Sequence, residues 1–170
     1  MDAITYRDAT PADAECVAEL ARRSFAEAAD GQYAAEDLAY FLGNYSKGNW
    51  ELQLEDRRFS LRLAEAGGNA VGFCDVGPQL LPIDSTSDAA ELRHLYVLSP
   101  WHGTGVAPTL MEWALAEARG RGADEVYLSV YAENAKAQRF YGRYGFVEAG
   151  RYGFDVGTQT DEDIIMRLRL

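Results

Sequence analysis

A glycine-containing turn between an apolar strand pattern and a helix pattern constrains the fold of this chain more than any other feature. Residues 99–111 read SPWHGTGVAPTLM and follow the apolar run LRHLYVL. Glycine reaches backbone angles that other residues avoid, and it leaves neighbouring amides uncovered. A helix N-terminus carries unpaired N–H groups and partial positive charge. The turn therefore serves either a tight strand-to-helix connection or an anion bound directly on its amides.

Two known phosphate-binding patterns do not match this turn. A P-loop would end in GK[ST], which is missing here, and the dinucleotide pattern GxGxxG would need a glycine where Pro108 stands. The proline fits the first turn of a helix, where a missing N–H costs least. The turn alone leaves both readings open, packing and anion binding.

The spacing of apolar residues changes several times along the chain. Three- and four-residue spacing predicts helices opening at Thr10-Pro11, over 34–42, around 50–56, and over 105–119 and 134–144. Alternation and short apolar runs predict strands at 3–7, 58–66, 70–76, 91–98, 126–131, 146–150 and 163–170. The glycines at 67 and 68 predict a hairpin turn. Hairpins mixed with crossovers predict a mixed sheet with helices, an α/β or α+β fold, in one domain over residues 1–170.

Charge and length exclude several classes of function. The net charge of −11 argues against nucleic acid as a partner, and the absence of an 18-residue apolar run argues against a membrane span. Residues 1–57 hold 12 acidic and 5 basic residues, a net charge of −7. This predicts either a solvated acidic surface or attraction of a cationic ligand. Cys16 and Cys74 form no CxxC or Cys/His cluster, so we expect buried thiols in a reducing cytoplasm.

Three stretches resemble the sequence motifs of one enzyme family. The segment HGTGVA (102–107) resembles the pattern Q/R-x-x-G-x-G/A, with His102 in place of the usual Gln or Arg. The preceding LYV (95–97) resembles the family's fourth strand. Downstream, residues 134–146 read NAKAQRFYGRYGF, which resembles N-x-x-A-x-x-[FL]-Y-x-x-x-GF. In this order, over nearly the whole chain, the stretches resemble the GNAT N-acetyltransferases.

The resemblance implies a fold and a cofactor. The fold would be a mixed, mostly antiparallel twisted sheet of about six to seven strands with about four helices, splayed between strands 4 and 5. The cofactor would be acetyl-CoA or coenzyme A, with its pyrophosphate on the turn amides and its pantetheine arm between the splayed strands. The implied cofactor-binding residues are Leu95, Tyr96, Val97, His102, Gly103, Thr104, Gly105, Val106, Ala107, Asn134, Ala137 and Tyr141.

The resemblance also implies catalytic roles, each with a structural alternative. Tyr141 would protonate the departing thiolate, or it packs as one aromatic residue of a helix face. Asn134 would cap its helix and also contact the cofactor. Glu91 would remove the ammonium proton through a water, or it simply pairs with Arg93 or another cation. The two histidines, His94 and His102, are alternative bases, although packing against a helix is expected for His94 and contact with solvent for His102. Strict alternation places Glu91 on the face of Arg93, Leu95 and Val97, opposite His94. The amine would attack the thioester directly, with no covalent enzyme intermediate and no metal.

The acceptor is implied by a finer resemblance. Ser24-Phe25, Glu36-Asp37-Leu38, Tyr152–Gly157 and Asp163–Met166 resemble bacterial spermidine/spermine N-acetyltransferases. The implied acceptor is thus a small-molecule primary amine, with a polyamine as the finer expectation, and a homodimer is common in the family. The alternatives are a protein N-terminus or lysine as acceptor, or an acyl-CoA-binding sensor without turnover. The expected acceptor-binding residues are Tyr33, Glu36, Asp37, Tyr40 and Phe154.

Overall fold

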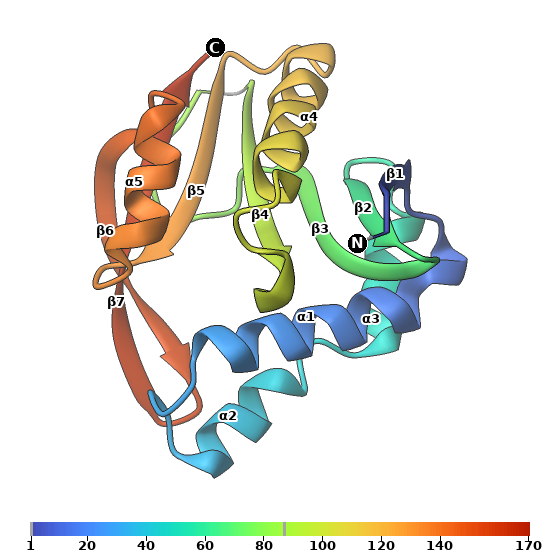
Figure 1. Ribbon diagram of the computed structural model, residues 1–170. Coiled ribbons are helices and arrows are strands. Elements are labelled where there is room, and N and C mark those ends of the chain that lie inside the picture. Colours follow the sequence, from blue (N-terminus) through green and yellow to red (C-terminus); the bar gives the residue numbers. More distant parts are fainter. Residues whose placement is uncertain (1, 87) are drawn as a thin grey trace.

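The computed structural model describes residues 2–86 and 88–170 (Figure 1). Seven strands form one sheet: β1 (Ile4–Asp8), β2 (Ser60–Ala66), β3 (Asn69–Pro78), β4 (Ala89–Val97), β5 (Glu125–Tyr131), β6 (Val147–Val156) and β7 (Gln159–Arg169). The helices are α1 (Ala14–Ala28), α2 (Ala35–Leu42), α3 (Lys47–Glu55), α4 (Val106–Gly120) and α5 (Ala135–Arg143). Short 3₁₀ turns at Pro11–Asp13 and Ser99–Trp101 precede α1 and α4. The last two strands are longer than predicted, because their outer halves carry polar residues and no apolar alternation.

The strands follow the order β1-β2-β3-β4-β5-β7-β6. All neighbours are antiparallel except β4 and β5, which are parallel. The parallel ladder covers only Ala89–Glu91 against Glu125–Tyr127. Beyond it the two strands separate, as Figure 1 shows. The expected mixed and mostly antiparallel sheet, splayed between its fourth and fifth strands, is confirmed.

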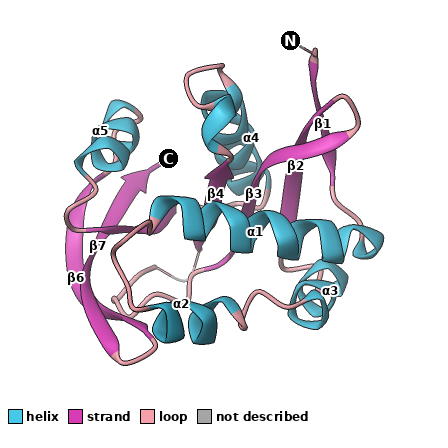
Figure 2. Cartoon of the chain, turned by 60° about the horizontal axis from the view of Figure 1, so that its bottom comes forward, coloured by secondary structure: helices cyan, strands magenta, loops and turns pink. Residues whose placement is uncertain are grey.

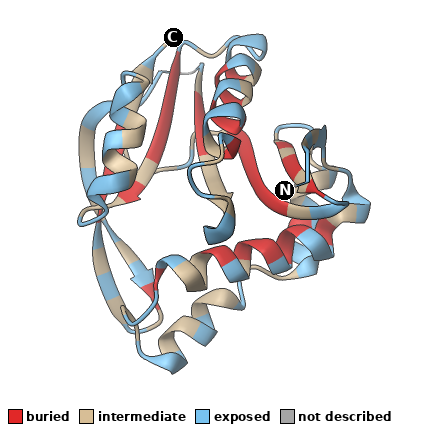
Figure 3. Ribbon diagram, in the orientation of Figure 1, coloured by how far each residue is buried: buried red, intermediate tan, exposed pale blue. Residues whose placement is uncertain are grey.

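Helices cover both faces of the sheet (Figure 2). Helices α4 and α5 lie on one face, and their apolar side chains share a core with β3, β4, β5 and β7. Helices α1 and α3 lie on the other face, over a smaller core that includes Leu61, Leu63, Phe73 and Trp50. Buried residues are concentrated in the central strands, α1 and α4 (Figure 3). No helix of the described residues is both long and apolar enough to cross a membrane.

A β-bulge in β4 changes which side chains share a face. Asp75 of β3 pairs with His94, whereas the next residue of β3 pairs with Leu92, so Arg93 is the extra residue. Leu92 therefore faces α4, and Glu91 lies on the same face as His94. The alternation predicted from the sequence is wrong here, because one inserted residue reverses the side-chain pattern on one side of it.

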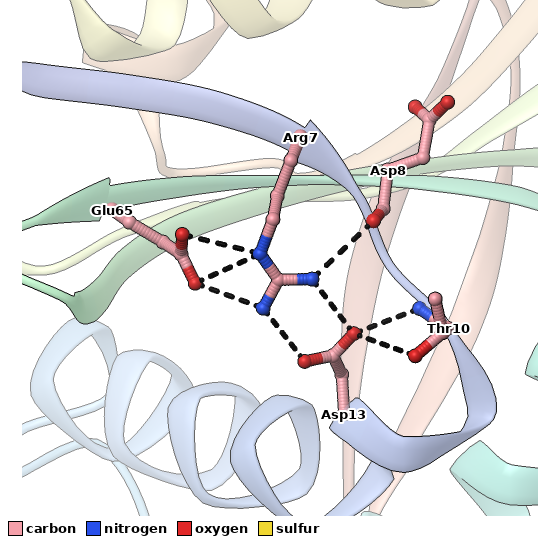
Figure 4. A network of polar contacts seen from close by, with 5 residues as sticks. All are labelled: Arg7, Asp8, Thr10, Asp13 and Glu65. Carbon is pink, nitrogen blue, oxygen red and sulfur yellow. Dashed lines mark hydrogen bonds and ion pairs between the residues drawn. The ribbon is translucent and has the colours of Figure 1, made fainter.

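A charged cluster fixes the β1 edge of the sheet (Figure 4). Arg7 donates to Glu65 of β2 at 2.9 Å and to Asp13 at 2.7 Å. Asp13 in turn accepts from the backbone N–H of Thr10 at 2.8 Å, which caps the turn that opens α1. The hydrogen bonds from Arg7 lower the pKa of Asp13 to about 2. The cluster thus joins two strands and the start of the first helix.

The two cysteines have different environments. Cys74 lies on β3 within the core shared with α4 and is fully buried. Cys16 is exposed on α1, so the expectation of two buried thiols is wrong for this residue. Its neighbours Val17 and Leu20 face the core, and position 16 falls on the outer side of the helix.

Candidate active site

The glycine turn leaves an open surface at the start of α4. Gly103 and Gly105 have φ of +75° and +92°, the left-handed region that favours glycine. A Cβ atom at either position would meet no atom within 4 Å. The absence of side chains therefore opens space above the turn and is not required for internal packing. This observation favours the anion-binding reading of the turn.

The amides of this turn are unpaired. Among the described residues, the backbone N–H groups of 103–107 donate to no protein acceptor, and the first helical bond runs from Thr109 to the carbonyl of Gly105. The Thr104 hydroxyl donates to the carbonyl of Trp101 at 2.6 Å, and the backbone N–H of Thr104 has no acceptor among the described residues. Five consecutive free N–H groups before a 15-residue helix fit a bound diphosphate.

His102 belongs to this turn but contacts the preceding strand. Its Nε2 lies 2.7 Å from the carbonyl oxygen of Val97, the last residue of β4. The side chain thus ties the turn to the end of the strand. The backbone amides that follow it do not depend on this contact.

The separation of β4 from β5 exposes a strand edge. Leu95, Tyr96 and Val97 lie beyond the last residue of β4 that pairs with β5. Leu95 and Val97 pack against the core under α4, and the Tyr96 ring lies on the opposite face, against Phe73 at 5.5 Å. The edge of β4 that faces β5 can pair with an extended amide-containing chain as an added strand would.

Tyr141 approaches this gap from α5. Asn134 caps the helix, with its Oδ1 accepting from the N–H of Ala137 at 3.1 Å, so its predicted capping role is present. Ala137 and Tyr141 both pack against the core under α4. Burial raises the pKa of Tyr141, and its hydroxyl has no hydrogen-bond partner among the described residues. The hydroxyl is therefore protonated at neutral pH and free to donate.

Tyr96 approaches the same gap from the other face. Its hydroxyl lies 3.0 Å from that of Tyr45, in the connection between α2 and α3. Burial is the main cause that raises its pKa, and the neighbouring phenols Tyr45 and Tyr141 add to the effect. Tyr96 therefore contacts Tyr45 directly, while Tyr141 acts on it only through its charge.

Glu91 is buried within the paired part of β4. It is 8% exposed, and its carboxylate accepts from the N–H of Leu80 at 2.7 Å. Burial raises its pKa, although the amide of Leu80 and the charge of Arg93 oppose that shift. The carboxylate thus has the raised proton affinity of a base, but one amide already binds it.

His94 and Asp75 form a pair that the sequence did not reveal. The Nδ1 atom of His94 lies 2.8 Å from Oδ1 of Asp75, and Gln53 of α3 donates to the other carboxylate oxygen at 2.7 Å. Asp75 is fully buried. Aromatic rings surround the imidazole, with Trp50 at 5.3 Å between ring centroids. The alternation along one strand does not give the register between β3 and β4, and the bulge at Arg93 changes that register. The pairing therefore did not follow from the sequence.

The acceptor-side residues predicted from the sequence are only partly brought together. Tyr33 donates to Asp161 of β7 at 2.5 Å, and Phe154 of β6 packs against Phe41 of α2 with ring centroids 5.4 Å apart. Glu36 and Tyr40 are exposed on α2, with Tyr40 78% accessible. Tyr33 and Phe154 therefore form part of one wall between α2 and the strands β6 and β7. Glu36 and Tyr40 lie outside this wall.

Asp37 has a structural contact in place of an open one. Its carboxylate accepts from the N–H of Thr158 at 2.7 Å and from the same residue's hydroxyl. A Cβ atom at the neighbouring Gly157 would lie 2.6 Å from the Cα of Asp37, so glycine is required there. Asp37 thus holds the turn between β6 and β7 against α2.

Two aspartates of β7 complete the wall, and neither was predicted to bind the acceptor. Asp163 is 7% exposed, and burial, followed by the charge of Asp161, raises its pKa to about 6. Burial also acts on Asp161, but hydrogen bonds from Tyr33, Gln159 and Gln32 outweigh it and lower its pKa. Among the described residues, no ion pair involves either aspartate. The wall thus holds acidic groups and aromatic rings without a cation.

Comparisons with known proteins identify relatives over most of the chain. The model of the acetyltransferase (GNAT) family matches residues 17–146. An uncharacterized N-acetyltransferase of Mycobacterium tuberculosis is 35% identical over 155 residues, 91% of this chain and 96% of that protein. The aminoalkylphosphonate N-acetyltransferase of Salmonella typhimurium is 32% identical over 96 residues, 56% of this chain and 62% of that protein.

The fold has close counterparts among solved structures. The PaiA N-acetyltransferase of Thermoplasma acidophilum, solved in complex with coenzyme A, superposes with a TM-score of 0.80 over 99% of both chains at 22% identity. The similarity extends over the whole sheet and its helices, and so includes the strand gap and the turn before α4.

Proposed function

The chain belongs to the acetyltransferase (GNAT) family, and on that premise we propose that it acetylates a small, cationic primary amine such as a polyamine. It is an acetyl-CoA-dependent N-acetyltransferase. The observation that carries the finer proposal is the pair Asp161 and Asp163 on β7, which has no protein cation among the described residues. An amine substrate supplies the missing positive charge.

The donor side rests on backbone groups. Acetyl-CoA supplies an acetyl group activated as a thioester. The free N–H groups of 103–107 would hold its pyrophosphate, and the open edge of β4 at 95–97 would hold its amide-containing arm. Asn134 and Ala137 would contribute by placing α5, and His102 by fixing the turn to Val97.

The transfer needs an acid for the departing thiolate and a base for the acceptor ammonium. The Tyr141 hydroxyl, protonated because burial raises its pKa, would donate its proton to the thiolate that leaves. For the base, the sequence predicts Glu91, and burial raises the pKa of its carboxylate. The amide of Leu80 competes for that carboxylate.

The acceptor side favours a cation over an anion. Asp163 and Asp161 are acidic, and Tyr33 and Phe154 supply aromatic surface beside them. Aromatic faces and carboxylates both bind ammonium groups. An aminoalkylphosphonate, the substrate type named for the Salmonella relative, carries an anionic group that this wall would repel.

The test is a steady-state assay of thiol release from acetyl-CoA against a matched acceptor panel. The panel contains spermidine, a diamine, a monoamine of equal length, an aminoalkylphosphonate and a short peptide with a free N-terminus. We expect kcat/KM to be highest for the polycations. Preferential turnover of the phosphonate or the peptide would overturn the acceptor proposal. Cofactor binding without turnover of any acceptor would favour the sensor alternative.

A further inference from the structure

We propose that His94, oriented by the buried Asp75, takes the proton from the acceptor ammonium. This inference rests on the proposed amine acetylation. The Nδ1 atom of His94 lies 2.8 Å from Oδ1 of Asp75. An ionised carboxylate only accepts hydrogen bonds, so Nδ1 carries the hydrogen and Nε2 carries the lone pair. Nε2 is therefore the basic atom of the pair.

Asp75 is held so that it can fix the imidazole. It is fully buried, and its second oxygen accepts from Gln53 at 2.7 Å. Its position opposite His94 follows from the register of β3 against β4. Both carboxylate oxygens are thus bound to side chains, one on each side, and the ring has one preferred tautomer and orientation. A buried aspartate orients a histidine base in this way in hydrolase triads.

Nε2 remains accessible on the acceptor side of the sheet. Among the described residues, Nε2 has no hydrogen-bond partner. It is also not one of their buried atoms without a partner, so the atom is exposed to solvent. The side chain as a whole is 15% exposed. A basic nitrogen that meets solvent from an otherwise aromatic pocket can reach a substrate ammonium directly or through one water.

The position of His94 along β4 places it beside the gap. Pairing with β5 ends at Glu91, and His94 lies three residues further, about 10 Å along an extended strand. Its ring contacts Tyr96 with centroids 5.3 Å apart, and Tyr96 lies in the part of β4 that has separated from β5. Glu91 lies on the same face, but in the paired region and bound to the amide of Leu80.

The proton balance of the transfer is complete with these groups. Nε2 of His94 removes one proton from the ammonium, and the neutral nitrogen attacks the thioester carbonyl. The N–C bond forms and the C–S bond breaks, with the electron pair leaving on sulfur. The sulfur takes a proton from Tyr141, the new amide nitrogen gives up its second proton to restore the phenol, and His94 releases its proton to solvent.

Several charged, polar and aromatic groups face the imidazole. Asp75 carries the nearest negative charge, and Glu91 lies further along the same face. Arg22 donates to the carbonyl of Tyr45, and the charge of Arg93 acts on the Tyr45 phenol. The remaining neighbours are polar or aromatic: Gln53 and Trp50 of α3, Phe73 of β3, Tyr45, and Tyr96 of β4.

The first experiment compares His94→Gln with Glu91→Gln in the full-length enzyme. With an acceptor that is an ammonium ion at the assay pH, we expect His94→Gln to lower kcat by about 100-fold or more, the usual contribution of a general base. With a β,β-difluorinated diamine assayed at a pH above the pKa of its reacting amine, so that this amine is largely neutral, the loss should shrink to a few-fold. Acetyl-CoA binding and thermal unfolding serve as controls for folding. An equal loss with both acceptors, or a larger one for Glu91→Gln, would overturn the assignment.

Asp75→Asn tests the positioning role. Loss of the carboxylate removes the group that holds the hydrogen on Nδ1, so kcat with an ammonium acceptor should fall by about 10-fold or more, and less with the neutral acceptor. In the double variant with His94→Gln the two losses should not add, because both residues act through the same nitrogen. A merely structural role for Asp75 would lower activity equally with both acceptors and would add to the loss in His94→Gln.

A measurement without turnover separates this inference from the proposed function. The chain has two histidines, so ¹⁵N spectra of histidine-labelled protein can be assigned with His102→Asn. We expect the neutral imidazole of His94 to carry its hydrogen on Nδ1. The opposite tautomer would overturn the role of His94 even if amines are acetylated. Failure of the wild-type enzyme to acetylate any amine, with the expected tautomer present, would instead overturn the proposed function and the base role that rests on it.

Discussion

Asp13 beside β1 and Asp163 on β7 are both little-exposed aspartates, but their surroundings differ. Asp13 is bound by Arg7, and this lowers its pKa to about 2 (Figure 4). Asp163 is buried near Asp161 with no ion pair among the described residues, and its pKa rises to about 6. The protein supplies the counter-charge at one edge of the sheet and omits it near the other. We infer that the omitted cation belongs to the substrate.

The largest expected effect is on acceptor turnover, from the β7 aspartates that have no ion pair among the described residues. Replacing Asp161 and Asp163 together by asparagine should lower kcat/KM for spermidine by about 100-fold, because two charge-assisted contacts worth roughly 1.5 kcal/mol each are lost. A monoamine should lose much less, and the dissociation constant of acetyl-CoA should stay constant. Steady-state kinetics across the acceptor panel measures this. A uniform loss for mono- and polyamines would mean that the aspartates do not select for charge.

The second prediction concerns Asp163 and stability. Its pKa is higher in the folded state than in the unfolded chain, so the folded state gains stability as the pH falls through about 6 towards 3.8. Above pH 7 the buried charge costs on the order of 3 kcal/mol, and Asp163→Asn should stabilise the free enzyme by about that amount. The gain should shrink at pH 4.5. Chemical unfolding at both pH values is the measurement. A variant less stable than wild type at pH 7.5 would contradict the prediction.

These two predictions rest on residues that sequence spacing did not identify. The turn at Gly103 and Gly105, the Asn134 cap and the helix that carries Tyr141 were predictable, because each depends on neighbours within a few residues. The pairing of His94 with Asp75 was not, since a bulge sets the register between their strands. The short strand predictions at 146–150 and 163–170 missed the outer half of the β6–β7 hairpin, because its polar residues show no apolar alternation. There Asp161 meets Tyr33 from a distant loop.

The third prediction removes the cation from the β1 edge. Arg7→Gln leaves Asp13 and Glu65 facing each other without a counter-charge, and the unfolding free energy should fall by about 1 kcal/mol, a value limited by the partial exposure of the arginine. The stability that Asp13 contributes is present above about pH 4 and is lost as the pH falls towards 2, so the difference between variant and wild type should narrow there. Acceptor kinetics should not change, because β1 and β7 lie at opposite sides of the sheet. A change in KM would show that the two regions are coupled.

The smallest effect is expected for Glu36 and Tyr40. The sequence placed both in the acceptor site, but the structure leaves them on the outer surface of α2. Glu36 is exposed, and Tyr40 is 78% accessible. A charge in water is screened within about 8–10 Å at physiological salt, unlike the buried charge of Asp163. Glu36→Gln and Tyr40→Ala should therefore change kcat/KM for spermidine by less than about two-fold, which is within the small range usual for surface substitutions. Phe154→Ala, within the wall, is the matched comparison and should raise KM for the same acceptor. If Glu36→Gln weakened spermidine turnover as strongly as Asp163→Asn, acidic surface in general would attract the substrate, and the missing counter-charge on β7 would not be what selects it.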